Sequence, residues 1–366
     1  MFAGTYRGRR VLVTGHTGFK GSWLAAWLSE LGATVAGYAC GVPTTPSHFE
    51  AAALRDRLAD HVGDIRDRAR LGQVLDEFAP EIVFHLAAQA LVRQSYADPV
   101  TTFETNAIGT LNVLECARTR PGIRAVVLIT SDKAYRNVEW VWGYRETDAL
   151  GGDDPYSGSK ACAELIAHSY VRSFFPLEGP LAAVATTRAG NVIGGGDWAA
   201  DRIVPDCVRA WSAGQVVRLR HPQATRPWQH VLEPLSGYLA LGARLWTRSG
   251  VEAGAAYNFG PDGTVNHPVE ALMAAMARLW PEARWERDPG AAGAVKEAML
   301  LKLCCDRALF ELQWRPVLSF DECVRMTTEW YRDYYANPAG APARTQAQIG
   351  QYTALASERG LAWAGR

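Results

Sequence analysis

The sequence lacks a long apolar run and an excess of charge of either sign. Its 38 basic residues balance 38 acidic residues, so the formal net charge of the 366-residue chain is zero. A neutral chain argues against nucleic acid or an anionic membrane as a partner. No apolar run reaches the roughly 18 residues that a membrane-spanning helix needs. Residues 1–4 lead directly into an apolar strand, so we expect no signal peptide and a cytoplasmic protein.

Cysteine is also scarce. The seven cysteines are odd in number and scattered along the chain. This pattern fits reduced thiols in a cytoplasm and not a disulfide framework. Cys304 and Cys305 are neighbours in a strand-like segment, but no His or Cys stands near them at ligand spacing. We expect both to be packing residues, and we expect no metal site.

Apolar strands that alternate with helical segments indicate an α/β fold with a doubly wound parallel sheet. The predicted strands cover residues 10–14, 34–38, 81–86, 125–130 and 182–187, and the predicted helices include 99–118 and 156–174. The chain exceeds the roughly 250–300 residues at which a single core stops growing. A second, smaller lobe is therefore expected.

A glycine-rich turn joins the first strand to the first helix. The strand at 10–14 is followed by Gly15-His16-Thr17-Gly18-Phe19-Lys20-Gly21 and then by an apolar helix through Leu31. Glycines permit a tight turn close to a pyrophosphate, and a helix N-terminus offers it free N–H groups and partial positive charge. The strand before and the helix after make this run a predicted dinucleotide site. Lys20 is placed to assist a phosphate, although we favour a solvated helix residue.

The acidic residue that usually follows the second strand is missing. Strand 34–38 is followed by Ala39-Cys40-Gly41, without an Asp or Glu for a ribose 2′-hydroxyl or an Arg for a 2′-phosphate. The choice between NAD and NADP therefore stays open at this position. Asp64, which precedes Ile65 after a further strand expected between strands 34–38 and 81–86, is a candidate for the adenine amino group. Its alternative role is to cap a helix before Arg66 and Asp67.

After residue 188, the alternation of strands and helices becomes less regular. Helices are predicted at 202–211, 230–246 and 268–279. A short strand at 257–259 is predicted to return to the sheet, and 337–343 is predicted to be a linker. We expect residues 1–188, with a return of 228–262, to form a dinucleotide-binding Rossmann domain. Residues 189–227 and 263–366 are expected to form an interleaved α/β substrate lobe and a C-terminal tail.

Two short segments carry the groups for chemistry. Tyr156 and Lys160 form Y-x-x-x-K, and residues four apart share one face of a helix. An ammonium beside a phenol favours the phenolate, which lets the tyrosine act as a base. Ser131, Asp132 and Lys133 follow an apolar strand, and open α/β sheets place their chemistry at such ends. Asp132 and Lys133 add a second acid and a second base, which indicates more than alcohol oxidation.

The acid and base roles of Asp132 and Lys133 face an electrostatic conflict. Lys133 must be neutral to act as a base, and bringing its pKa from about 10.4 to about 7 costs roughly 4–5 kcal/mol. Asp132 must be protonated to act as an acid, yet a neighbouring ammonium favours its carboxylate. The alternative is that Asp132 and Lys133 form a solvated pair in a loop. Their position beside Ser131, at the end of a strand, argues against this alternative.

Taken together, these segments resemble the extended short-chain dehydrogenase/reductase family and, within it, the CDP-glucose 4,6-dehydratases. The resemblance is carried by residues 14–23, 85–89, 130–133, 139–146, 151–157, 194–198, 202–206 and 225–230, and by Gln348-Ile349-x-x-Tyr352. It spans most of the chain. Lys133 stands where sister dehydratases carry Glu.

The resemblance implies an NAD-dependent hydro-lyase that converts CDP-D-glucose into CDP-4-keto-6-deoxy-D-glucose. C4 is oxidised, water is eliminated across C5 and C6, and the stored hydride returns to C6. Tyr156 would take the proton of the 4-hydroxyl, while Lys160 lowers its pKa and holds the nicotinamide ribose, and Ser131 bonds the same oxygen. Lys133 would take the C5 proton, and Asp132 would protonate the departing 6-hydroxyl.

The resemblance also implies which residues bind cofactor and substrate. The cofactor-binding residues are Gly15, His16, Thr17, Gly18, Phe19, Lys20, Gly21, Asp64, Ile65, Leu86, Ala87, Ala88, Gln89, Asn106, Thr130, Tyr156 and Lys160. The substrate-binding residues are Gln89, Arg93, Ser131, Asn191, Arg202, Arg220 and Arg226. A diphosphate needs bidentate cations, and Arg226 stands where relatives hold it. Gln89 and Arg93 have an alternative role as loop caps.

Further expectations concern aromatic residues, assembly and competing functions. Trp140, Trp142 and Trp198 are expected to shape the pocket, and His85 is expected to be a satisfied core residue. Helices 99–118 and 156–174 resemble those that pair in family dimers, so a homodimer is expected, with a tetramer as the alternative. The competing functions are another nucleotide-sugar 4,6-dehydratase, a 4-epimerase that would not need the Asp–Lys pair, and an NAD-sensing module without turnover.

Overall fold

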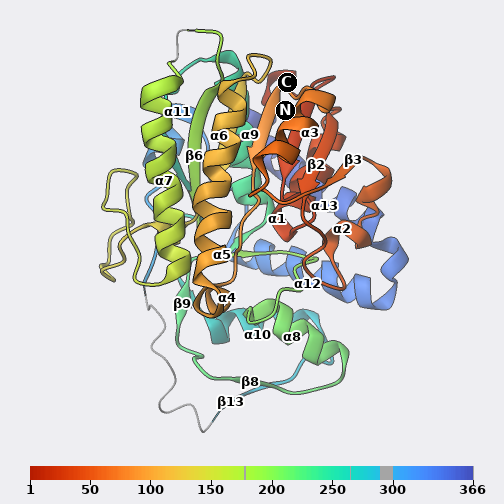
Figure 1. The fold of residues 1–366 in the computed structure, drawn as a ribbon. Helices are drawn as coiled ribbons and strands as arrows, with labels where there is room; N and C mark the ends of the chain where they lie inside the picture. Colours follow the sequence, from red (N-terminus) through yellow and green to blue (C-terminus); the bar gives the residue numbers. More distant parts are fainter. Residues whose placement is uncertain (177–178, 264, 289–299, 366) are drawn as a thin grey trace.

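A parallel sheet of seven strands forms the centre of the computed structural model, which describes residues 1–176, 179–263, 265–288 and 300–365 (Figure 1). Its strand order is β11-β6-β5-β4-β1-β2-β3. The strands are β1 (Arg10–Thr14), β2 (Thr34–Ala39), β3 (Ala59–Val62), β4 (Ile82–His85), β5 (Ala125–Ile129), β6 (Ala183–Ala189) and β11 (Ala256–Phe259). The order reverses between β1 and β4, which opens a crevice at their carboxyl ends. The predicted α/β fold class is confirmed.

Helices cover both faces of this sheet because successive strand residues point to opposite sides. Val11 and Val13 belong to the core on the side of α1 and α9, whereas Leu12 belongs to the core on the side of α3, α6 and α7. These helices are α1 (Phe19–Glu30), α9 (Leu232–Thr247), α3 (Arg68–Phe78), α6 (Gly109–Arg118) and α7 (Pro155–Phe174). Both faces of the strands other than β3 are therefore buried, as their apolar runs require.

The helix predicted over 99–118 is interrupted. The segment consists of α5 (Pro99–Phe103), a π-helical turn at Glu104–Ile108 and α6. The turn carries Asn106, whose side chain accepts a hydrogen bond from the Gln89 backbone N–H at 2.8 Å and donates to Ser159 Oγ at 2.8 Å. Single π-turns of this kind often occur at functional sites. Hydropathy alone does not reveal such a turn, since the apolar period continues through it.

A second group of elements lies below the sheet in Figure 1, where α8, α10, β8 and β13 are found near α4. The group consists of α8 (Ile203–Ser212), α10 (Val269–Leu279), β8 (Val217–Leu219) and β13 (Trp285–Arg287), whereas α4 (Val92–Ala97) follows β4. Two short pairings form two-stranded sheets of their own: β7 (Val192–Ile193) with β10 (Gln229–His230), and β9 (Thr225–Arg226) with β12 (His267–Pro268). The proposed division into domains stays a prediction, and its range 263–366 includes residues outside the described part of the chain.

The remaining elements are α2 (His48–Ala51), a 3-10 turn at Leu54–Asp56, α11 (Asp306–Leu312), α12 (Phe320–Ala336) and α13 (Ala341–Glu358). The predicted linker at 337–343 is wrong in part: a 3-10 turn covers Pro338–Gly340 and α13 begins at Ala341. Proline at the start of a helix costs no hydrogen bond, so a proline-rich segment can open one. The strand-like segment at Cys304 is only a bridge between Leu303 and Tyr144. Among the helices of the described residues, none combines the length and apolarity that crossing a membrane requires.

Candidate active site

The glycine-rich turn is pressed against the end of β4. Gly15 has φ of +73°, and a Cβ atom there would lie 2.7 Å from the backbone nitrogen of Ala87. A Cβ atom at Gly21 would lie 2.1 Å from the carbonyl oxygen of Gly15. The N-cap of α1 is Gly18, and no side chain caps this helix. The first N–H groups of α1 are thus left for an anion, so the turn fits a dinucleotide pyrophosphate.

The side chain of His16 faces the protein interior. Its Nε2 lies 2.9 Å from Asp60 Oδ1, and a Cβ atom at Gly37 would overlap the imidazole. Burial lowers the pKa of His16, against the opposing effect of Asp60. The side chain therefore anchors the glycine turn to β2 and β3, and only the backbone of His16 is left for the cofactor.

Lys20 is half-buried, so the expectation of a solvated helix residue is wrong. Burial lowers the pKa of Lys20 to about 8, with an opposing effect from the Asp132 carboxylate. Arg202 and Asp197 also face it from the second group of elements. The first turn of α1 points across the crevice towards the carboxyl end of β5, and this direction is a tertiary feature that a sequence pattern does not contain.

Ser131 and Asp132 stand directly after β5, in a turn that continues as a 3-10 helix at Asp132–Ala134. Ser131 Oγ donates to Asp132 Oδ1 at 3.0 Å and accepts from the Lys133 backbone N–H at 3.2 Å. Burial raises the pKa of Asp132, against the opposing charge of Lys133. A Cβ atom at Gly190 would lie 2.8 Å from Asp132 Oδ2, so this glycine makes room for the carboxyl group.

Tyr156 and Lys160 share one face of α7 and meet the end of β5. The helix begins with Asp154 as N-cap and Pro155 in its first turn, and the backbone N–H of Tyr156 donates to Ser95 Oγ at 3.1 Å. Burial raises the pKa of Tyr156, while a hydrogen bond with Ser131 lowers it.

Arg202, at the start of α8 in the second group of elements, also affects the pKa of Tyr156. The positive charge of Arg202 lowers the pKa of Tyr156. Lys160 Nζ donates to the carbonyl oxygen of Ile129 at 3.4 Å, and burial lowers its pKa to about 8. The charge of Lys20 lowers the pKa of Lys160 further. Ser131, Asp132, Tyr156 and Lys160, which lie up to 29 positions apart in the sequence, therefore form one buried cluster with Lys20 and Arg202.

The polar residues after β4 mainly hold their own loop. The Gln89 side chain accepts from the Leu91 backbone N–H at 2.6 Å and donates to Thr102 Oγ1 at 3.0 Å, which is the alternative loop-capping role. Thr130 Oγ1 donates to Glu164 of α7. His85 is a satisfied core residue as expected, with ring nitrogens 2.8 Å from Thr14 Oγ1 and 3.1 Å from Thr110 Oγ1.

The loop after β3 contains a paired carboxylate. Asp64 Oδ2 lies 2.7 Å from the Arg66 guanidinium, whose hydrogen bonds lower the Asp64 pKa. The N-cap of α3 is Asp67, which accepts from the backbone N–H of Arg70 at 2.9 Å, so the suggested capping role belongs to Asp67 and not to Asp64. Ile65 beside it is buried and contacts the position of Gly109.

The candidate substrate residues separate into two sets. Arg202 is half-buried and pairs with Asp197 at 2.8 Å, and Asn191 follows Gly190, the residue that adjoins the Asp132 carboxyl group. Both lie at the crevice. Arg226 is half-buried in β9 and donates to the Thr225 carbonyl, whereas Arg220 is exposed. Arg93 is exposed on α4 and reaches Asp201 at 2.7 Å, so it connects the two groups of elements at the surface.

Sequence reasoning missed one ion pair beneath the site. Arg188 of β6 and Glu164 of α7 form two hydrogen bonds at 2.9 and 3.0 Å, and both side chains are buried. The sequence feature that could have indicated this pair is a charged residue, Arg188, within an apolar strand. Conversely, the expectation for Trp198 is wrong: its ring is buried in the aromatic core at 4.8 Å from the Tyr334 ring centroid. A buried indole packs there because α12 covers the loop.

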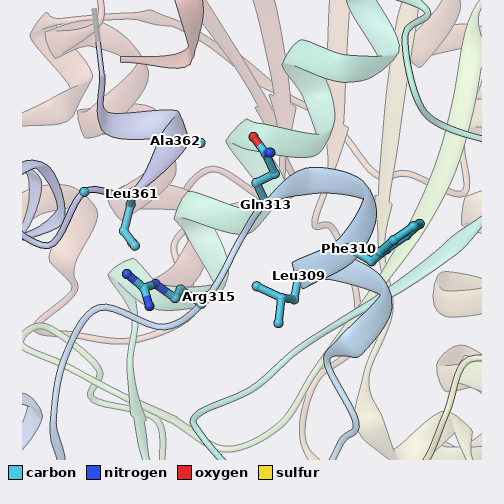
Figure 2. Close-up of a pocket in the computed structure, with 7 residues that line it drawn as sticks. Leu309, Phe310, Gln313, Arg315, Leu361 and Ala362 are labelled. Atoms are coloured by element: carbon cyan, nitrogen blue, oxygen red, sulfur yellow. The ribbon is translucent and has the colours of Figure 1, made fainter.

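Other features of the described residues lie outside this cluster. An open hollow between α11 and the C-terminal segment is lined by Leu309, Phe310, Gln313, Arg315 and residues 360–362, none of which belongs to the candidate site (Figure 2). Trp140 and Trp142 form a surface ring pair at 6.0 Å between centroids. Within the same described ranges, no three His, Cys, Asp or Glu side chains are grouped as a metal site.

The chain is similar to known nucleotide-sugar dehydratases and epimerases. The model of the GDP-mannose 4,6 dehydratase family matches residues 12–245. A CDP-glucose 4,6-dehydratase from Salmonella typhimurium is 49% identical over 331 residues, which are 89% of this chain and 91% of the relative. The structure is similar to the NAD-bound dTDP-glucose 4,6-dehydratase DesIV from Streptomyces venezuelae, with a TM-score of 0.73, 25% identity and coverage of 89% and 98%.

An NAD-bound UDP-glucose-4-epimerase from Stenotrophomonas maltophila has a TM-score of 0.77 over 90% of this chain and 99% of its own, with 21% identity that supports the fold alone. The family resemblance read from the glycine turn, Y-x-x-x-K and the Ser131 segment is confirmed by the relative at 49% identity. The protein belongs to the GDP-mannose 4,6 dehydratase family of the extended short-chain dehydrogenases/reductases.

Proposed function

We propose that this protein is a hydro-lyase that uses NAD to convert CDP-glucose into CDP-4-keto-6-deoxyglucose. The observation that carries the proposal is the buried cluster of Ser131, Asp132, Tyr156 and Lys160 at the carboxyl ends of the central strands. A 4-epimerase needs the tyrosine and the lysine but no acid for a leaving hydroxyl. The similarity to the Salmonella typhimurium CDP-glucose 4,6-dehydratase supports cytidine as the base.

The backbone of Gly15, Gly18 and the first turn of α1 would hold the pyrophosphate of NAD, and Lys160 would hold its nicotinamide ribose. When bound, NAD supplies the hydride acceptor for C4 and later returns the hydride to C6. The protein binds and orients both molecules. It also excludes water, because the reacting side chains are buried.

Tyr156 removes the proton of the sugar 4-hydroxyl, and Ser131 hydrogen-bonds the same oxygen. The phenolate is needed for this step, and burial opposes it by raising the Tyr156 pKa. The Ser131 hydrogen bond and the Arg202 charge counter that effect. A bound nicotinamide cation and the ammonium of Lys160 act in the same direction.

The elimination step assigns the acid to Asp132 and the base to Lys133. Burial raises the Asp132 pKa, which favours the protonated carboxyl group that must donate to the leaving 6-hydroxyl. Lys133 takes the C5 proton, which the neighbouring 4-ketone has made acidic, and would return a proton to C5 once hydride has been added at C6. Lys20, whose pKa is about 8, faces Asp132 and is a local amine from which the carboxylate can be reprotonated.

The diphosphate of the substrate would lie between the two groups of elements. Arg202 and Arg226 would supply cations, and Asn191, which follows Gly190, would supply an amide. This placement supports the division of labour between a dinucleotide-binding domain (residues 1–188 with 228–262) and a nucleotide-sugar lobe (189–227 and 263–366). Arg93 and Arg220, both exposed, would contribute only if the lobes close on the ligand.

The assembly proposed for the protein is a cytoplasmic homodimer. An apolar surface on α5 and α7, here called the α5–α7 surface, is lined by Phe103, Leu150, Gly151, Gly158, Ala161, Cys162 and Leu165. Leu165 is 59% exposed and Phe103 is 37% exposed. Exposed apolar patches of this kind mark interaction sites, and a twofold axis is the commonest way to cover one.

The function is tested by incubating the protein with NAD and, separately, CDP-glucose, dTDP-glucose, UDP-glucose and GDP-mannose. The expected result is a product of CDP-glucose that has lost one water, seen by mass spectrometry, without net formation of NADH. Release of the 4-epimer without loss of water would instead identify an epimerase. Binding of NAD without any turnover would support a sensing module.

A further inference from the structure

Glu164 lies on the face of α7 that carries the two residues proposed for oxidation. It follows Lys160 by four positions and Tyr156 by eight, and residues at these spacings share one side of a helix. Its carboxylate accepts hydrogen bonds from Thr130 Oγ1 and from the guanidinium of Arg188 on β6. All three side chains are buried. Helix α7 is therefore attached to the carboxyl end of β5.

The same ion pair reaches the residue that ends the turn after β5. Residues 131–133, here called the acid–base turn, lie between Thr130 and Tyr135. The Tyr135 hydroxyl accepts a hydrogen bond from Arg188 Nη1 at 2.8 Å, and the guanidinium lies 4.7 Å from the centroid of the Tyr135 ring. Both sides of the acid–base turn are thus attached to one buried ion pair.

The Tyr135 hydroxyl is fixed by a partner on each side. Burial raises the Tyr135 pKa, against the charge of Arg188, so the phenol keeps its proton and donates to Asn258 Oδ1 of β11 at 2.8 Å. The Asn258 amide in turn donates to the carbonyl oxygens of Tyr144 and Cys304 at 2.9 and 3.0 Å. A movement of the Tyr135 side chain would break the hydrogen bonds with the guanidinium and the amide.

The placement of the acid–base turn matters because the reacting groups come from two elements. Tyr156 and Lys160 would act at C4 of the sugar from α7, whereas Asp132 and Lys133 would act at C6 and C5 from the turn. A misplacement of about 1 Å can cost about a hundredfold in rate. Elimination therefore depends on how the turn is held relative to α7, and oxidation depends mainly on α7 itself.

We propose that Tyr135 is a positioning residue for water elimination. Its hydroxyl, held by Arg188, keeps the acid–base turn in place relative to the helix that carries Tyr156. The acid and the base of the turn then meet the sugar whose C4 has been oxidised. The inference rests on the proposed dehydration, and it adds a residue that acts through the turn and not on the sugar.

The test is a single-turnover experiment on the full-length variant Tyr135→Phe, which removes one oxygen atom and keeps the ring. Excess enzyme is mixed with NAD and CDP-glucose, and sugar nucleotides and reduced cofactor are followed by rapid quench, mass spectrometry and absorbance. We expect oxidation at C4 within about twofold of wild type and water loss slowed at least about tenfold, so that the 4-keto hexose nucleotide accumulates. Deuterium at C5 should then slow product formation more than it does in the wild type.

Tyr144→Phe is the matched control. The Tyr144 ring stacks on Tyr135 with centroids 5.1 Å apart, but its hydroxyl bonds Asn137 and the backbone N–H of Val138, which lie beyond the turn. This variant should keep the wild-type partition between 4-keto hexose and dehydrated product. If Tyr135→Phe does not fold by circular dichroism, Thr130→Val breaks the hydrogen bond on the other side of the turn, and its partition decides the question.

A folded Tyr135→Phe variant with the wild-type partition would overturn the inference. The same holds for a variant in which oxidation and elimination slow by an equal factor, because such a result marks a general loss of structure. A wild-type protein that releases no dehydrated product from CDP-glucose would contradict the proposed function. A wild type that dehydrates CDP-glucose, together with a Tyr135→Phe variant that matches it, contradicts only this inference.

Discussion

The ionisable side chains at the carboxyl end of β5 are shielded from solvent, and burial moves their pKa values in opposite directions. It raises the pKa of Tyr156 and Asp132 and lowers the pKa of Lys160 and Lys20 to about 8. Every shift favours the neutral form. Asp132 must be neutral to protonate the departing hydroxyl. Burial favours this neutral form, although the adjacent Lys133 opposes it.

Replacement of Tyr156 should reduce turnover without affecting cofactor binding or stability. Tyr156→Phe removes the hydroxyl that is proposed to take the 4-hydroxyl proton, and general-base groups contribute about 10²–10⁴-fold. We expect kcat to fall by at least about a hundredfold while NAD binding and the unfolding midpoint stay unchanged. Steady-state kinetics and calorimetric NAD titration measure the two effects. Retained turnover in this variant would exclude Tyr156 as the base.

Lys20 should set the pH dependence of turnover. Its charge lowers the pKa of both Lys160 and Asp132, so Lys20→Met should raise both values. The protonated forms then persist to higher pH, and the alkaline limb of the kcat profile should move up by about one pH unit. Lys20→Arg keeps the charge and should keep the profile. An unmoved alkaline limb in Lys20→Met would show that Lys20 does not act on these groups.

Lys133→Ala separates oxidation from elimination. Without its base, the C5 proton stays in place, while Tyr156 and Ser131 still support oxidation at C4. We expect a 4-keto hexose nucleotide and reduced cofactor to accumulate to no more than one equivalent of enzyme, detected by absorbance and mass spectrometry. Normal water loss in the variant would remove Lys133 from the mechanism.

At the scale of elements, one buried ion pair fixes α7, the helix that carries Tyr156. Glu164 of α7 binds Arg188 of β6, and Thr130 and Thr186 add hydrogen bonds to the same carboxylate. These partners lower the Glu164 pKa against the effect of burial. Its contribution to stability is therefore present above its unfolded pKa near 4.5 and is lost as the pH falls below it.

Glu164→Leu leaves the Arg188 charge buried without compensation. We expect the free energy of unfolding at pH 7 to fall by about 3–5 kcal/mol, measured by urea denaturation. The double variant Glu164→Leu/Arg188→Met removes both charges and should recover much of that loss. A single variant as stable as wild type would mean that the pair does not hold α7 on the sheet.

The sequence could predict the elements and the central cluster, because the informative residues adjoin them. Ser131 and Asp132 follow an apolar strand, and Tyr156 opens a helix, so the parallel sheet brings their ends together. The partners of other side chains could not be predicted. Gln89 caps its loop through Thr102, and Lys20 faces Asp132, only because of how distant segments pack. Periodicity contains no information about such contacts.

At the scale of the whole molecule, the α5–α7 surface should join two copies of the chain. Leu165→Glu places a charge on this surface, and an unpaired charge in an apolar interface is costly. We expect the variant to sediment as a monomer with an intact fold. Leu309→Glu is the matched control, since Leu309 is 52% exposed but lies in the separate hollow of Figure 2. A wild-type monomer, or a dimeric Leu165→Glu variant, would contradict the proposed assembly.

The position of β11 beside β6 has a consequence for synthesis on the ribosome. β6 ends at Ala189, yet its outer neighbour and the helix α9 that covers its face come only after residue 231. A nascent chain therefore carries an unpaired edge strand with a bare apolar face while the intervening lobe is translated. Such a chain is prone to aggregate. Slower translation should lower the soluble yield, and chaperones that shield strand edges should restore it.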